Sequence, residues 1–222
     1  MVEAKRNNVS ELRQQKDAER KARTRRAVLE AAKVVFARQG YHNTKISDIV
    51  REAGVGQGTL YRSFTNKRHV FSTLFEELVE SLVGEFAEMS ARQPGDVAEY
   101  REASVRAVTR MTRGIEQNRE LMLLFLREGP SIDREFEELM DGVLDRFAAV
   151  ARFHLHRAIA GGFARPCDAD LVAQSVVGMG LRQLERWLSG RLGVVDLEAA
   201  VRELVDFCFW GFGPRDEQRS EG

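Results

Sequence analysis

The segment 44–67, TKISDIVREAGVGQGTLYRSFTNK, carries two short helical patterns with a glycine between them. In the first pattern, apolar residues recur at the three- and four-residue spacings of a buried helix face, at Ile46, Ile49, Val50 and Ala53. Gly54 follows in the place of a helix-ending glycine. The second pattern, 57–64, turns Leu60 and Phe64 inward and polar side chains outward. Two short helices joined by a tight turn predict a helix-turn-helix, whose second helix fits the major groove of DNA.

Further helices are predicted on both sides of this motif. Residues 25–39 place four apolar side chains on one face, Val28, Ala32, Val35 and Phe36, and Gly40 ends the pattern. On the other side, Asn66 can cap a helix that continues to about Ala91. Alternating β-branched runs are absent. The predicted fold class is all-α, with an N-terminal three-helix helix-turn-helix domain and a C-terminal helical bundle domain.

The outward side of the second short helix carries residues that can read base edges. Gln57 can form a bidentate pair with adenine, and Arg62 can do the same with guanine O6 and N7. Thr59 and Tyr61 can reach a phosphate or a thymine methyl group. Two alternatives stay open, because Arg62 can clamp a phosphate instead of a base and the Tyr61 ring can pack beneath the helix.

The stretch from Thr24 to Phe71 closely resembles the TetR family of bacterial regulators. The residues that carry the resemblance are Phe36, Gly40, Thr44, Ile49, Ala53, Gly54, Val55, Gly58, Thr59, Leu60, Tyr61, Phe64 and Lys67. The resemblance implies that Gly58 lies in the DNA-binding helix with the four outward residues. It also implies that Thr44 and Lys67, at two helix N-termini, hold the sugar-phosphate backbone. Thr44 can equally be a helix cap and nothing more.

Two positions depart from the family pattern. Gly56 stands where a capping serine is common, which weakens one expected cap or phosphate contact. Val50 stands where a small alanine is usual, and this difference concerns packing alone. Neither departure changes the expected fold.

Charge is divided unevenly along the chain, although its formal sum is zero. Residues 1–70 hold sixteen Lys or Arg and seven Asp or Glu, whereas residues 71–222 hold eighteen and twenty-seven. A basic end of this kind indicates a polyanion partner, although surface charge can also serve solubility alone. The predicted domains are a flexible basic arm at 1–23, the DNA-binding domain at 24–70 and a ligand-binding and dimerisation domain at 71–222.

The C-terminal part contains five further helical patterns, at 97–117, 119–128, 132–160, 168–188 and 197–211. The family resemblance implies that the last two form a four-helix bundle across the twofold axis of a homodimer. Burial within one chain explains their apolar stripes equally well. A twofold dimer would place its two reading helices on adjacent major-groove faces of a palindromic operator.

The segment 121–126, LMLLFL, is apolar on every face of its helix, so it is buried on all sides or lines a cavity. The predicted pocket residues are Met111, Leu121, Phe125, Phe147, Phe153 and Trp187. Ordinary core packing is the alternative for each of them. An apolar and aromatic lining favours a lipophilic effector, and the family resemblance adds compounds with an acyl chain.

No catalytic, metal or cofactor site is predicted. The G-x-S-x-G, H-E-x-x-H, P-loop and G-x-G-x-x-G motifs are absent, and His154 and His156 would diverge on a helix by about 200°. Cys167 and Cys208 lack metal-binding spacing and are expected to be reduced. No apolar run reaches the roughly 18 residues of a spanning helix, so we expect no membrane partner and a cytoplasmic, nucleoid-associated protein.

The sequence therefore predicts a dimeric repressor that leaves its operator when a small molecule shifts its conformational population. Activation is equally compatible with these residues. The alternative is an architectural DNA-binding protein of the same fold whose C-terminal domain recruits a protein partner. An enzyme with an accessory DNA-binding end is disfavoured, because no acid, base, nucleophile or cofactor motif can be named.

Overall fold

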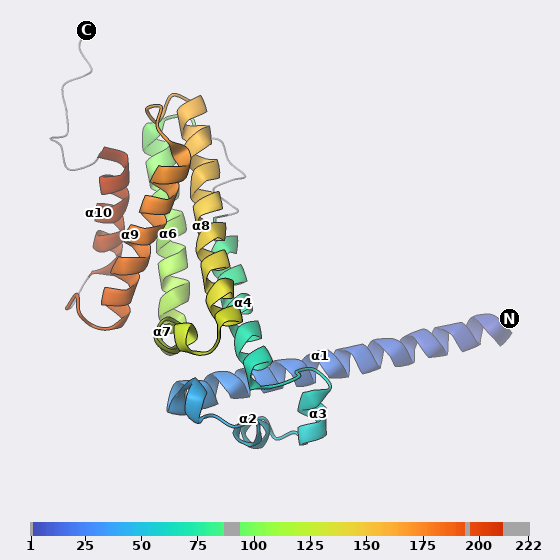
Figure 1. Ribbon diagram of the computed structural model, residues 1–222. Helices are drawn as coiled ribbons and strands as arrows, with labels where there is room; N and C mark the ends of the chain where they lie inside the picture. The colour runs from blue at the N-terminus through green and yellow to red at the C-terminus, as the bar shows by residue number, and fades with distance from the viewer. Residues whose placement is uncertain (1, 87–93, 194–195, 211–222) are drawn as a thin grey trace, which may run out of the picture. The chain divides into compact units, whose positions relative to one another are not determined.

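The computed structural model describes residues 2–86, 94–193 and 196–210, and within these ranges it consists of helices without a strand (Figure 1). The all-α fold class is therefore confirmed. The chain divides into two compact units, residues 1–77 and 78–222. None of the described helices combines the length and the apolar character that crossing a membrane requires.

The first unit contains α1 (Val2–Asn43), α2 (Ile46–Ala53), α3 (Gln57–Tyr61) and the first part of α4 (Lys67–Gly84). The apolar stripe predicted on α1 is confirmed, because Val28, Ala32, Val35 and Phe36 are all fully buried. Phe36 meets Phe71 of α4 edge to face, with 5.1 Å between ring centroids, a favourable aromatic geometry. Burial of these side chains fixes α1, α2 and α4 around one small core.

Helix α1 begins far earlier than expected. Residues 1–23 were predicted to form a flexible arm, but α1 is helical from Val2 onward. The side chains of 13–23 are all exposed, so no packing against the rest of the unit explains this helix. Its other end agrees with the sequence, since Gly40 has a φ of 78° and interrupts the helix there.

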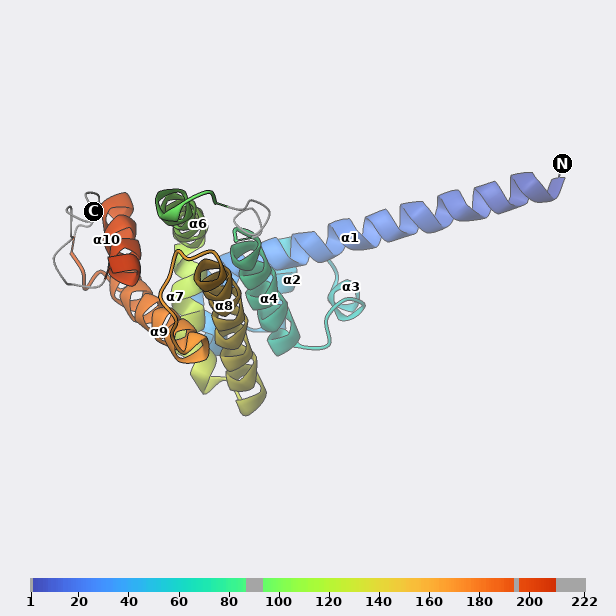
Figure 2. The ribbon, with the colours of Figure 1, turned by 90° about the horizontal axis from the view of Figure 1, so that it is seen from above.

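The second unit contains the end of α4, then α6 (Val97–Gln117), α7 (Arg119–Glu128), a 3₁₀ turn η1 (Gly129–Ser131), α8 (Arg134–Ala160), α9 (Ala169–Leu188) and α10 (Leu197–Trp210). Within this unit α8 packs on α9, α10 on α6, and α7 on α9 (Figures 1 and 2). These bounds lie within two residues of the predicted ones. Position 211, the expected last residue of the final helix, lies outside the described residues.

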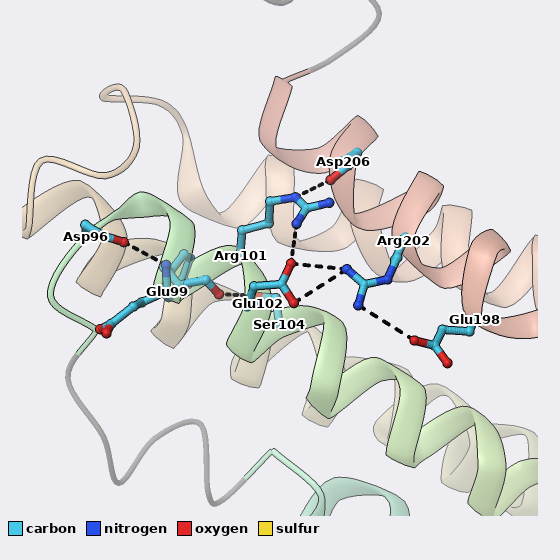
Figure 3. Close-up of polar contacts among 9 residues, drawn as sticks. Asp96, Glu99, Arg101, Glu102, Ser104, Glu198, Arg202 and Asp206 are labelled. Carbon is cyan, nitrogen blue, oxygen red and sulfur yellow. Dashed lines mark hydrogen bonds and ion pairs between the residues drawn. The ribbon is translucent and has the colours of Figure 1, made fainter.

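A polar network joins α6 to α10 (Figure 3). A small apolar cluster from the same two helices accompanies it. Arg101 Nε donates to the buried Asp206 carboxylate, and Arg202 donates to Glu102 at 3.1 Å. Arg202 also lies 3.7 Å from Glu198, one turn away on α10. The apolar cluster contains Val105, Val201 and Val205, with Val108 and Phe209 packed against it. The α6–α10 contact is thus both apolar and ionic.

Helix α4 supplies buried residues to both units. Val70, Phe71 and Leu74 are buried in the first unit, and Leu78, Val79 and Leu82 are buried in the second. The helix was expected to run to about Ala91 and ends instead at Gly84; positions 87–91 lie outside the described residues.

Three contacts hold the end of α4 inside the second unit. Arg110 of α6 donates to the Glu85 carboxylate at 2.9 Å and to the Glu85 carbonyl at 3.1 Å. Arg146 of α8 donates to Glu80 at 2.7 Å. A Cβ added at Gly114 of α6 would lie 3.3 Å from Leu82, so glycine permits close packing there. The end of α4 is therefore in contact with both α6 and α8.

Candidate nucleic-acid interface

The turn between α2 and α3 has the local geometry that its glycines predict. Gly54 has a φ of 64°, and its N–H donates to the carbonyl of Arg51 at the end of α2. Gly56 then precedes α3 in extended conformation and accepts from the Thr59 N–H at 2.9 Å. Since Gly56 has no side chain, the cap that a serine would add is missing, as the sequence indicates.

Helix α3 separates buried apolar side chains from exposed polar ones. Leu60 is fully buried and Phe64, just beyond the helix, is almost so. On the outward side, Gln57, Gly58 and Arg62 are exposed and Thr59 is partly exposed. Tyr61 is 50% exposed, so half of its surface stays available to a ligand. Within the described residues, the side chains of Gln57 and Arg62 have no hydrogen-bond partner in the chain, which leaves their side-chain donors and acceptors available for bases.

Thr44 was predicted to contact the DNA backbone, but its side chain is buried and bonded within the chain. Its side chain is only 2% exposed, and its hydroxyl donates to the Gly40 carbonyl at 2.6 Å. It does not cap α2 either, because α2 begins at Ile46 with Lys45 as the N-cap residue. A phosphate accepts hydrogen bonds, and the single hydroxyl hydrogen of Thr44 is already used. Thr44 therefore fixes the bend after α1, and we leave it out of the interface.

Lys67 joins two parts of the first unit. Its ammonium donates to the carbonyls of Tyr41 at 2.6 Å and His42 at 3.3 Å, and lies 4.2 Å from the centroid of the Tyr41 ring. The start of α4 is thereby tied to the turn that follows α1. An ammonium has three donors. Two of these donors bind the carbonyls of Tyr41 and His42, so the phosphate contact expected of Lys67 would use the third.

Two residues that support the interface were not singled out from the sequence. The Arg25 guanidinium lies 4.5 Å from the centroid of the Phe64 ring and donates to the Ser63 carbonyl, which ties α1 to the end of α3. Asp48 accepts from the Lys45 N–H at 3.0 Å, and this hydrogen bond leads the causes that lower its pKa. An acid three residues after the N-cap is the sequence signal that could have identified Asp48.

Known proteins share this arrangement. Residues 28–74 match the sequence profile described as "Bacterial regulatory proteins, tetR family". These residues therefore form a DNA-binding domain of the TetR type. The TetR-type helix-turn-helix thus comprises the α2–α3 pair just described, and the family consists of DNA-binding regulators rather than enzymes.

Two relatives illustrate how the similarity is distributed. The "Fatty acid metabolism regulator protein" of Bacillus subtilis is 24% identical over 181 residues, which cover 80% of this chain and 91% of the relative. The "HTH-type transcriptional regulator AcrR" of Shigella flexneri is 39% identical, but over 74 residues that cover 33% of this chain and 34% of the relative. Similarity to the fatty acid regulator thus extends beyond the DNA-binding domain.

Solved structures of two bacterial regulators have the same fold. "Fatty acid degradation regulator FadR from Bacillus halodurans" superposes with a TM-score of 0.74 at 23% identity, covering 86% of this chain and 97% of that one. "FadR from Bacillus subtilis in complex with stearoyl-CoA" superposes with a TM-score of 0.70 at 22% identity, covering 84% of this chain and 98% of that one.

The residues predicted to line a pocket lie in several settings within the second unit. Phe125 is fully buried and Leu121 nearly so, whereas Met111, Phe147 and Trp187 are partly buried. Phe153 is 51% exposed, with the Arg157 guanidinium 5.7 Å from its ring centroid. Phe153 therefore lies on the outward face of α8 and does not line an interior space within one chain. We remove it from the candidate pocket residues.

Trp187 belongs to the end of α9, where Arg119 of α7 meets it. Arg119 donates to the carbonyls of Trp187 at 3.0 Å and Leu188 at 2.8 Å, and its guanidinium lies 5.2 Å from the centroid of the Trp187 ring. A cation at the last carbonyls of a helix stabilises its C-terminus. Trp187 thus faces a charged group on one side, which the sequence pattern could not indicate.

His154 of α8 is buried, and its carbonyl accepts from the Tyr100 hydroxyl at 2.9 Å. Loss of hydration, followed by the nearby Arg157 charge, lowers the pKa of His154 to about 4. Burial likewise raises the pKa of Tyr100 to about 12. Both side chains are therefore neutral near pH 7.

The buried His154 is expected to make the second unit sensitive to acid. Unfolding restores its ordinary pKa of about 6.5, so the unfolded chain binds the proton more readily. The contribution of His154 to the free energy of unfolding should be constant above pH 6.5. It should fall by about 2–3 kcal/mol as the pH drops to 4. Denaturant unfolding of His154→Gln across this range should give a flatter pH profile. An equal change in the exposed His156→Gln variant would contradict the assignment.

Proposed function

We propose that this chain is a ligand-responsive, dimeric repressor that binds a palindromic operator and leaves it when a lipophilic small molecule binds the C-terminal domain. The observation that carries the proposal is the exposed side of α3. Leu60 is buried there, while exposed or partly exposed side chains surround it, namely Gln57, Thr59, Tyr61 and Arg62. Small polar side chains on a rigid helix are suited to read base edges. Gly58 lets the helix backbone approach the DNA closely, because no Cβ projects there.

The proposed effector is an amphiphile with a long acyl chain, such as an acyl thioester of coenzyme A. Two similar proteins whose matches cover most of this chain carry fatty acid regulation in their names, and a third, FadR from Bacillus subtilis, was solved with stearoyl-CoA. The candidate lining that remains is apolar or aromatic, namely Met111, Leu121, Phe125, Phe147 and Trp187. Such a lining favours an alkyl chain by loss of hydrated apolar surface. The architectural alternative is less favoured, since these relatives are named for metabolic regulation.

Helix α4 supplies the proposed route from effector to DNA. Its first half is packed in the DNA-binding core through Phe71, and its end is held by Arg110 and Arg146 of the effector domain. An effector that prefers one placement of α6 and α8 would favour one placement of α4. The change in DNA affinity cannot exceed the difference in effector affinity between the two states.

The proposed dimer forms through α9 and α10. Large apolar side chains on these helices are exposed in the single chain, with Leu171 at 66%, Phe207 at 43% and Trp210 at 48%. A second copy can cover them across a twofold axis. We also propose three parts of the chain: the α1 extension at 1–23, the DNA-binding domain at 24–70 and the ligand-binding and dimerisation domain at 71–222. The proposed location is the cytoplasm, at the nucleoid, where the operator is.

A footprint of the purified protein on the DNA beside its own gene tests the repressor proposal. A short palindromic protected site is expected, with a random duplex at matched salt as control. Stearoyl-CoA and, as an unrelated lipophile, triclosan are then added to the bound complex. Uniform weak protection of all DNA would contradict sequence-specific repression and favour an architectural role.

Arg110→Ala is expected to separate DNA binding from release. The change removes the hydrogen bonds from α6 to Glu85 at the end of α4, while α3 is untouched. Operator affinity should stay near that of the wild type, and the effector concentration for half release should rise about 2- to 30-fold, since such contacts carry about 0.5–2 kcal/mol of coupling. Fluorescence anisotropy of labelled operator measures both quantities.

The matched control for this prediction is Arg113→Ala, on the same helix one turn away. Arg113 is largely exposed and lies 4.0 Å from Glu198, so its loss should alter neither quantity. Equal release curves for Arg110→Ala and Arg113→Ala would exclude the α6–α4 contact from the coupling.

A further inference from the structure

The extension of α1 that precedes the DNA-binding core is a helix whose described side chains are open to solvent. Every side chain from 13 to 23 is exposed, and the next buried residue along α1 is Val28. Both views of the ribbon show the blue half of α1 extending beyond α2 and α3 (Figures 1 and 2). Residues 13–23 therefore contribute no buried side chain to the core of the first unit.

The charges of the extension are gathered on one side. Arg13, Lys16, Arg20 and Arg23 are separated by three, four and three residues, which places them within about 80° of the helix circumference. Residues 13–23 hold five Lys or Arg against Asp17 and Glu19. The acids lie on either side of this face rather than on it. We call the four residues the basic face.

The basic face is not neutralised within the extension. Arg20 lies 3.9 Å from Asp17, and both side chains are 69% exposed, which makes this a weak, hydrated pair. For the other three members no ion pair is found among the described side chains. Four exposed cations on a solvated helix are therefore available to a polyanion.

We propose that the basic face is a second DNA-binding surface, which contacts phosphates outside the bases that α3 reads. The occupant is double-stranded DNA because the same helix continues into the core that holds α3, so a bound operator brings its flanking duplex to this unit. From residue 13 to residue 23 the helix rises about 15 Å, a length of duplex axis in which each strand carries about four phosphates. The inference rests on the proposed operator binding and adds an interface to it.

The test replaces the basic face by glutamine, as Arg13→Gln, Lys16→Gln, Arg20→Gln and Arg23→Gln in one protein. Glutamine forms helices about as well as lysine and arginine, so the extension keeps its helix propensity. Operator affinity is measured from about 50 to 200 mM salt. The logarithmic salt slope should become less steep by about 0.9 for each lost phosphate contact, or by about 3–4 for each bound chain. Preference for the operator over its single-base variants should be unchanged.

A matched control removes the same charge elsewhere. Arg106, Arg113, Arg127 and Arg134 are exposed in the second unit, and their joint replacement by glutamine changes the net charge equally. The wild-type hydroxyl-radical footprint should extend past that of the basic-face variant at its outer edges, and the control should match the wild type. A salt slope of the basic-face variant equal to that of the control overturns this inference alone. Absence of any specific site for the wild-type protein overturns the proposed function and this inference with it.

Discussion

Joint replacement of Gln57 and Arg62 by alanine is expected to bring the affinity for the operator close to that for random DNA. Both side chains are exposed on α3 and have no partner in the described chain, so the variant leaves the core of Leu60 and Phe64 intact. Each bidentate base contact discriminates by about 1–3 kcal/mol, and well-separated contacts add. The loss should be about 2–6 kcal/mol, or roughly 30-fold and more, in a titration of labelled operator.

Specificity distinguishes base reading from phosphate binding. If both residues read bases, affinity for the random duplex at matched salt stays almost constant while operator affinity falls. An equal loss on both duplexes would assign Arg62 to a phosphate and exclude direct reading. Gln117→Ala with Arg134→Ala, two exposed positions of the second unit, should change neither affinity.

Arg101→Ala is expected to cause a large loss of folding stability. It removes from the buried Asp206 carboxylate the guanidinium that donates to it across the α6–α10 contact. Loss of one partner of a buried ion pair costs about 3–5 kcal/mol, and the 21% exposure of the Arg101 side chain places the expected cost near 3 kcal/mol. Urea unfolding should show an earlier midpoint. Because α10 is a proposed dimer helix, sedimentation should also show more monomer.

The control for the α6–α10 network is an exposed ion pair within a single helix, α8. Arg134 donates to Glu138 at 2.9 Å, with side chains 89% and 63% exposed, and Arg134→Ala should cost less than about 1 kcal/mol. Double replacement of Arg101 and Asp206 by apolar residues should recover part of the lost stability. A midpoint for Arg101→Ala equal to that of Arg134→Ala would mean that the network does not stabilise α10.

Helical periodicity and glycines were sufficient to predict most of the fold. The stripe from Val28 to Phe36 can be buried only as one helix face, and Gly40 and Gly54 end helices because they adopt positive φ. The exposure of Arg62 followed from the same period, since inward Leu60 and Phe64 place it on the opposite side, whereas Gln57 lies about 60° from Leu60 and is exposed as the first residue of α3.

The structural roles of single polar groups could not be predicted in this way. A threonine before a helix is a common cap, and only the coordinates reveal that the Thr44 hydroxyl turns back to Gly40. Likewise, Lys67 and Arg119 find their carbonyl partners in residues far away in sequence. Phe153 was assigned to a pocket on its apolar character, but periodicity does not say which side of α8 faces inward when neighbouring positions are mixed.

The sharing of α4 between the two units bears on how the protein unfolds. Helix hydrogen bonds link each residue to one four positions away, so melting of residues up to 77 removes support from those that follow. The two units are therefore not thermodynamically independent, as domains joined by a flexible linker would be. Operator bound to the first unit should protect the amides of Leu78, Val79 and Leu82 in the second unit from hydrogen exchange. The exchange rates of these amides would then report how much of the protein is bound to operator.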